Sequence, residues 1–273
     1  MLVAALILAA PAYSKDNKKK RAEPAEAEIA SQWNGKVVAI LGDSISDERQ
    51  LSEGTDTYWH QLIQILGIEP HNYGISGHQT KDIIGQAERA KAELGNKIDA
   101  FLIFIGTNDF ERSVELGEWF EYTTKTATIG GPTEVTRRYR TLSKAATYRG
   151  RINQMMDYLK TNFPEQQVIL LTPIHRGFST FGEDNIQPDE YFTNAIGLYI
   201  DDYVAVMKET ANVWAVPVID LNAVSGLYPM NEQFHRYFMS GVRDVLHPNT
   251  LGHKRMAYAI AYQLLGYPAS FKY

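Results

Sequence analysis

Short, mainly apolar runs alternate along this chain with longer segments that carry apolar residues at helical spacing. The runs lie at residues 37–41, 99–105, 168–172 and 216–220, and a shorter one begins at Pro70. Runs of four to eight aliphatic and β-branched residues next to glycine or polar residues are typical of buried strands. Five strands that alternate with helices predict an α/β domain with a mostly parallel sheet covered on both faces.

Cap residues and helical spacing predict the helices between these strands. They are expected at residues 56–67, at a segment ending near Leu94, and at 149–162, 191–212 and 250–265. Residues 110–147 break the alternation, because aromatic and basic residues are scattered there among threonines and glycines. Long irregular segments of this kind usually form lids or binding walls. Two roles stay open for its aromatic side chains: stacking on sugar rings, or packing as local core.

The first apolar run stops on Gly42-Asp43-Ser44. In open α/β sheets, ligands bind beyond the carboxyl ends of the strands, so Ser44 is placed where a nucleophile would act. Asp and Ser are also common turn and helix-cap residues, and taken alone this short motif fits either role.

Two other strand ends offer groups that could stabilise a developing negative charge. Gly74 and Gly77 follow the second strand, and a glycine there allows a backbone N–H to approach a substrate closely. Asn108 follows the third strand and could donate its side-chain amide in the same way. The alternatives are an ordinary glycine turn for the first pair and a turn cap for Asn108.

Asp244 and His247 lie three residues apart, just before the last expected helix. On a tight loop this spacing can place the carboxylate against the imidazole Nδ1, which leaves Nε2 free to accept a proton. His253 falls inside the helix and is interpreted as a packed residue. A metal site built from His247, Asp244 and His253 is the weaker alternative.

Composition narrows the classes of function. The net charge of −5 over 273 residues, with its one basic run at residues 15–21, argues against a nucleic-acid partner. The chain has no cysteine, which excludes disulfides, thiolate metal sites and a cysteine nucleophile.

Residues 1–14 predict a secretory signal peptide. An apolar core too short to span a bilayer is followed by Ala12-Tyr13-Ser14, although the usual basic segment before the core is missing. We expect cleavage after Ser14, export to the periplasm or the cell exterior, and no stable membrane insertion; an ordinary buried N-terminal element is the alternative. Residues 15–34 have the composition of a charged flexible linker, which leaves 35–273 as the folded domain.

Four blocks, in order along the chain, resemble the SGNH hydrolase family, also called GDSL esterases. The blocks are Gly42-Asp43-Ser44, Gly77, Gly106-Thr107-Asn108-Asp109 and Asp244-Val245-Leu246-His247-Pro248. The resemblance covers about residues 36–265. It implies a flavodoxin-like three-layer α/β/α sandwich around a five-stranded, mostly parallel sheet, and ester hydrolysis through an acyl-serine intermediate without cofactor or metal.

The resemblance also implies a role for each matching residue. Ser44 would be the nucleophile, His247 the base and Asp244 the group that orients it. The N–H groups of Ser44 and Gly77 and the side-chain amide of Asn108 would form the oxyanion hole. Gly77 is preferred to Gly74 because the Ser-Gly pair matches the family block, and Asp43 and Asp109 are interpreted as structural.

The resulting hypothesis is a secreted serine esterase that removes O-acetyl or similar short acyl groups from carbohydrate. Export, the aromatic segment and the lack of a long apolar stretch suited to a lipid chain favour it. The rivals are a lysophospholipase or thioesterase for longer acyl chains, and a non-catalytic carbohydrate-binding protein. The expected partner is a small-molecule or polysaccharide ester, and the oligomeric state stays open.

Overall fold

A computed structural model describes residues 31–50 and 54–272. Its centre is a five-stranded sheet, all of whose strands are parallel, in the order β2-β1-β3-β6-β9. The strands are β1 (Val37–Gly42), β2 (Glu69–Asn72), β3 (Ala100–Phe104), β6 (Gln167–Leu171) and β9 (Val218–Ile219). This confirms the predicted parallel sheet of five strands.

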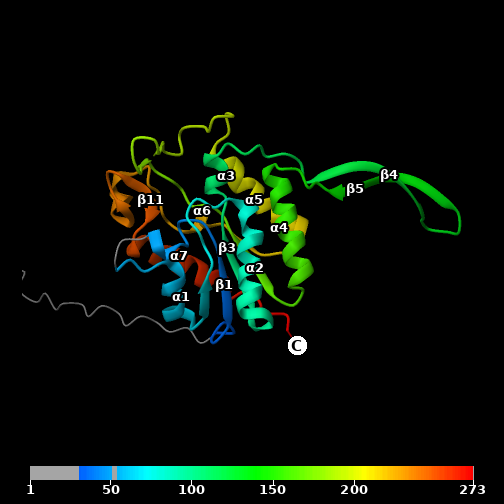
Figure 1. Ribbon diagram of the computed structural model, residues 1–273, viewed down its shortest axis with the longest axis horizontal. Coiled ribbons are helices and arrows are strands. Elements are labelled where there is room, and N and C mark those ends of the chain that lie inside the picture. Colours follow the sequence, from blue (N-terminus) through cyan, green and yellow to red (C-terminus); the bar gives the residue numbers. More distant parts are fainter. Residues whose placement is uncertain (1–30, 51–53, 273) are drawn as a thin grey trace, which may run out of the picture.

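Helices cover both faces of the sheet and make three layers (Figure 1). One face packs against α1 (Tyr58–Leu66) and α7 (Thr250–Leu264), and the other against α2 (Ile83–Leu94), α4 (Tyr148–Asn162) and α5 (Ile200–Trp214). Along β1, Val38 and Ile40 join the first core and Ala39 and Leu41 the second, as the alternation of side chains along a strand requires. The sheet is therefore buried on both faces, which explains its continuous apolar runs.

A second, smaller sheet lies beyond the carboxyl ends of the main strands. Its order is β10-β11-β7-β8, with β7 (Ser179–Thr180), β8 (Ile186–Gln187), β10 (Phe238–Ser240) and β11 (Asp244–Pro248). The segment at 244–248, predicted to be a loop, is thus a strand, because its backbone pairs with β10 and β7. The helix predicted from residue 191 begins only at Ile200, since residues 191–199 form turns.

Residues 110–147 are more regular than predicted. After the short α3 (Thr107–Glu111), the strands β4 (Phe120–Thr128) and β5 (Glu134–Leu142) pair through nine antiparallel residue pairs without a register shift. This hairpin projects away from the body of the molecule (Figure 1). The prediction of an irregular segment was wrong, because both faces of the hairpin are exposed and its strands lack the apolar alternation that marks a half-buried strand. The short helix α6 (Leu221–Val224) follows β9.

The folded part begins earlier than predicted. Trp33 was assigned to the linker, but its side chain is buried and its indole N–H donates to the carbonyl of Leu264 at 2.7 Å. The predicted signal peptide at 1–14 and most of the linker lie outside the described residues. Within the part of the chain that the structure describes, no helix is both long and apolar enough to cross a membrane.

Candidate active site

Ser44 sits on the turn that ends β1, and close packing under the turn fixes its position. A Cβ on Gly42 would lie 2.5 Å from Ser46 Oγ and 2.7 Å from the carbonyl oxygen of Phe104, so only glycine fits. Gln86 of α2 clamps the same residue, accepting from the Gly42 N–H at 2.8 Å and donating to its carbonyl at 2.7 Å. The clamp holds the backbone on one side of Ser44, and nothing in the sequence marked Gln86 for this role.

Asp43 points into the protein beneath the turn. It is fully buried, and Oδ1 accepts from the Ile45 N–H at 3.0 Å. Burial raises the pKa of Asp43 to about 7, against the opposing effects of that hydrogen bond and of nearby His247. Its position inside the turn agrees with the structural role expected from the sequence.

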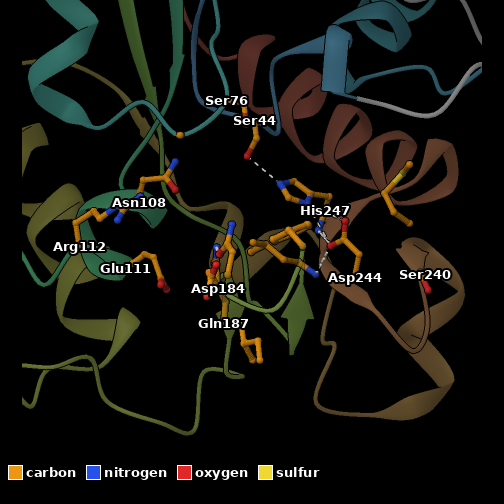
Figure 2. Close-up of a pocket in the computed structure, with 16 residues that line it drawn as sticks. Ser44, Ser76, Asn108, Glu111, Arg112, Asp184, Gln187, Ser240, Asp244 and His247 are labelled. Carbon is orange, nitrogen blue, oxygen red and sulfur yellow. Dashed lines mark hydrogen bonds and ion pairs between the residues drawn. The ribbon is translucent and has the colours of Figure 1, made fainter.

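The structure brings Ser44, His247 and Asp244 into one hydrogen-bonded row, although Ser44 lies 203 residues from His247 (Figure 2). His247 Nε2 is 2.8 Å from Ser44 Oγ, and His247 Nδ1 is 2.9 Å from Asp244 Oδ2. A carboxylate at Nδ1 holds the neutral ring in the tautomer that leaves Nε2 free to accept a proton. A hydroxyl, an imidazole and a carboxylate in this order can generate a serine nucleophile.

Several hydrogen bonds favour the ionised form of Asp244. Its Oδ1 accepts from the backbone N–H groups of Leu246 and His247 and, at 3.3 Å, from Ser179 Oγ. Burial would raise the pKa of Asp244, but its bonds to the ring and backbone of His247 outweigh burial and leave the pKa below its ordinary value. Asp244 therefore stays ionised, and it orients the ring without competing for the proton.

The three groups predicted to bind an oxyanion all lie at one cavity. Ser44, Gly77 and Asn108 line it, whereas Gly74 does not. Among the described residues, the backbone N–H groups of Ser44 and Gly77 have no hydrogen-bond acceptor. Gly77 has a φ of +78° and open space at its Cβ position, while a Cβ on Gly74 would meet Ser46 Cβ at 2.9 Å. Gly77 thus borders the cavity, and Gly74 serves the packing beneath it.

Asn108 is fixed at the start of α3 by groups from neighbouring elements. Its Nδ2 donates to the carbonyl of His78 at 3.0 Å. The next residue, Asp109, is fully buried and accepts from the backbone and hydroxyl of Thr80 and, at 2.9 Å, from Arg151. Asp109 therefore ties α3 to the loop before α2 and to α4, in agreement with the structural role expected for it.

The cavity measures about 740 Å³, and eleven of the sixteen residues that line it have polar side chains. Its wall opposite the oxyanion groups comes from Phe181 and residues 184–187, in the turn after β7 and in β8, and from Met239 and Ser240 of β10. None of residues 113–148 lines it, so the predicted lid or binding wall at 110–147 was placed wrongly. Only Glu111 and Arg112, at the start of that segment, reach the cavity.

One aromatic ring does border the site, from a segment that the sequence did not mark. Phe181 is 43% exposed and lies edge to face with the His247 ring at 5.3 Å between centroids. Behind this wall the buried Arg176 donates to Gln187 Oε1 at 2.7 Å and reaches Glu111 at 3.5 Å. Arg176 therefore joins the two sides of the cavity, and no local pattern could have predicted it.

His253 is packed away from the cavity. It is fully buried in α7, its ring lies 6.1 Å from that of Tyr58, and burial lowers its pKa to about 3. Within residues 31–50 and 54–272, no group of three or more His, Asp or Glu side chains is arranged to hold a metal ion. The arrangement agrees with the interpretation of His253 as a packed residue.

A known protein family matches most of the chain. The model of the GDSL-like lipase/acylhydrolase family matches residues 40–255, which include Ser44 and His247. A search of curated proteins gave no match.

Solved structures share the fold over most of the chain. A protein from Lactobacillus plantarum is 24% identical, with a TM-score of 0.64 over 85% of this chain and 97% of its own. A possible lipase from Chitinophaga pinensis is 18% identical, with a TM-score of 0.58 over 84% and 97%. A catalytic mutant of an acetylxylan esterase from Geobacillus stearothermophilus is 19% identical, with a TM-score of 0.50 over 87% and 96%.

Proposed function

The chain belongs to the GDSL-like lipase/acylhydrolase family, and from this premise we propose that it is a secreted serine esterase that removes short acyl groups, above all O-acetyl groups, from carbohydrate. The family implies ester hydrolysis. The observation that carries the serine mechanism is the 2.8 Å contact between Ser44 Oγ and His247 Nε2, with Asp244 on the opposite ring nitrogen.

In the proposed mechanism, His247 Nε2 takes the proton of Ser44 Oγ as the oxygen attacks the ester carbonyl. The imidazolium then gives this proton to the departing alcohol, and the acyl group remains on Ser44. Water attacks the acyl-serine in the second half, with His247 again accepting and returning the proton. Asp244 stays ionised and stabilises the imidazolium in both halves.

Each attack places a negative charge on the former carbonyl oxygen. The N–H groups of Ser44 and Gly77 and the Asn108 amide would donate to it, and two of these donors have no other acceptor among the described residues. Donors that are fixed before the reaction stabilise the transition state more than the substrate.

The lining of the cavity favours a polar substrate. Glu111, Arg112, Asp184, Asn185 and Gln187 face the same space as Ser44, and they offer both donors and acceptors to hydroxyl groups (Figure 2). A long acyl chain would instead require a mainly apolar surface. The fold shared with an acetylxylan esterase is compatible with this choice. The aromatic residues of 110–148 do not contribute, since none of them lines the cavity.

Export is proposed from the sequence of residues 1–14. Expression of the full chain in a bacterial host, followed by N-terminal sequencing of the exported protein, tests it. The proposal expects a mature chain that begins at Lys15, and a chain retained inside the cell with its first residues intact would contradict it.

A series of acyl esters of increasing chain length, with the alcohol held constant, tests the substrate class. We expect kcat/KM to be highest for acetyl and to fall steadily as the chain grows, and acetylated xylo-oligosaccharides to release acetate. A maximum at eight carbons or more would favour a lysophospholipase or thioesterase. H247A is the matched control, because it should abolish every rate in the series, whereas a binding protein would show no hydrolysis even before the substitution.

A further inference from the structure

The arm, defined as residues 120–142, is a two-stranded hairpin with unpaired outer edges in the described part of the chain. Isolated two-stranded hairpins are marginally stable in water, and a regular free edge pairs readily with another chain. Natural edges are usually protected by charged side chains, proline or a bulge. β4 contains no proline or glycine, and its register with β5 is continuous over nine pairs.

The orientation of the free edge follows from one hydrogen bond at the base of the arm. The Ser143 N–H donates to the Trp119 carbonyl at 2.9 Å, so Trp119 directs its backbone groups toward β5. Successive residues of a strand direct these groups to opposite sides. Tyr122, Thr124 and Thr126 therefore present their N–H and C=O groups outward from β4.

We propose that two copies of this chain associate through β4, antiparallel, about a two-fold axis at Thr123. This register forms hydrogen-bonded pairs between Tyr122 and the partner's Thr124, and it places Glu121 opposite the partner's Lys125 twice. Opposite charges in directly facing positions stabilise strand pairing. An axis at Tyr122 or Thr124 would also match the outward groups, but neither brings the two charges together.

The other edge of the arm does not suit self-pairing. Full antiparallel overlap of two β5 strands, centred on Arg138, would place Arg138 opposite the partner's Arg138. A register centred on Thr136 would place Glu134 opposite the partner's Arg138, but it overlaps residues 134–138 alone. Pairing through β4 instead gives a four-stranded sheet with a β5 strand at each outer edge. A two-fold axis then makes a closed dimer and not a longer chain of copies.

Two arginine side chains that stack on aromatic rings stabilise the hairpin that would make this contact. Arg138 lies 4.0 Å from the centre of the Tyr122 ring, and Arg140 lies 4.0 Å from that of Phe120. Both pairs cross from β5 to β4 and add to the ladder between the strands. Glu121 and Lys125 occupy the opposite face of the hairpin from Tyr122, since residues an odd number apart in a strand point to opposite faces.

Sedimentation velocity of the full chain over a wide range of concentration tests the proposal, with E121K, K125E and the double variant E121K/K125E. We expect a reversible dimer for the wild type and a dissociation constant weakened on the order of tenfold by each single reversal. The double variant should recover the dimer, because it restores opposite charges in the same register. A wild type that stays monomeric, or a double variant weaker than both single ones, would overturn the proposal.

Proline substitutions at the two edges distinguish pairing through β4 from pairing through β5. Thr126 and Thr136 face each other in the arm, 2.8 Å apart at their Oγ atoms, and each directs its N–H outward. T126P removes a donor from the β4 edge and T136P one from the β5 edge, so only T126P should weaken the dimer. Equal effects of the two, or a dimer unaffected by T126P, would contradict pairing through β4. Esterase activity confirms that the main domain of each variant is folded, since no arm residue lines the cavity.

Discussion

The rim, defined as the turn after β1 that carries Ser44, and the arm at 120–142 are held in place by different kinds of contact. At the rim, a single serine is fixed by a glycine that tolerates no Cβ, by the Gln86 clamp and by two packed strands. The arm is held to itself by its own ladder and its stacked cations, and it is exposed on both faces. Buried contacts give the rim one conformation, which its chemistry requires, whereas the arm offers surface and free backbone groups.

This difference predicts where substitutions will act. Changes at the rim should alter the rate of hydrolysis by orders of magnitude, and changes in the arm should alter association with little effect on the rate.

The largest effect is expected for S44A. Without the hydroxyl no acyl-serine can form, and kcat should fall by about 10⁴-fold or more. The thermal midpoint should stay close to that of the wild type, because the substitution removes one oxygen atom at the edge of a cavity. Kinetics with a short-chain ester and a thermal scan measure both. Hydrolysis unaffected by S44A would contradict the proposed mechanism.

N108A should produce the next largest effect. Loss of one oxyanion donor typically lowers kcat by about 10²–10³-fold, with little change in KM, because the bond forms mainly in the transition state. N185A is the matched control, since Asn185 lines the same cavity on the opposite wall. It should act chiefly on KM, and a similar loss of kcat in both variants would argue against a special role for Asn108.

The main sheet and the motif positions could be predicted from sequence, but the cavity wall could not. Buried parallel strands leave apolar runs, and parallel strands bring their carboxyl ends to one edge, so Ser44, Gly77 and Asn108 could be expected at a common rim. The wall at 181–187 depends on the pairing of Ser179 with Asp244, 65 residues away, which no local pattern announces. The arm was missed for a different reason, because a hairpin exposed on both faces has no alternation to detect.

Acidification should reduce hydrolysis through the protonation of one group, His247. A protonated His247 cannot accept the proton of Ser44, and the pKa of Asp244 is held below its ordinary value, so this carboxylate is not the group that accounts for the loss. On the acid side, kcat/KM should fall about tenfold per pH unit. A slope twice as steep in the plot of log kcat/KM against pH would mean that a second group must also lose its proton for the reaction.

D43N should change the pH dependence of stability. Burial raises the pKa of Asp43 from 3.8 to about 7. Between these values the unfolded chain loses a proton that the folded chain keeps, so the free energy of unfolding falls as pH rises, by on the order of a few kcal/mol, and then levels off. Urea unfolding of both proteins from pH 4 to pH 8 isolates this contribution. Parallel curves for wild type and D43N would contradict it.

The smallest effect on catalysis is expected when the arm is shortened. Replacing residues 124–138 by Asn-Gly keeps the first four pairs, from Phe120–Leu142 to Thr123–Tyr139, and closes the last of them, a hydrogen-bonded pair, with a two-residue turn. Because no residue of the arm lines the cavity, kcat/KM should stay within about twofold of the wild type, in keeping with surface changes away from a site. The same variant should be monomeric, since it lacks Thr124, Lys125 and Thr126. A large loss of activity in the folded, shortened protein would mean that the rim and the arm are coupled, and that the separation drawn between them does not hold.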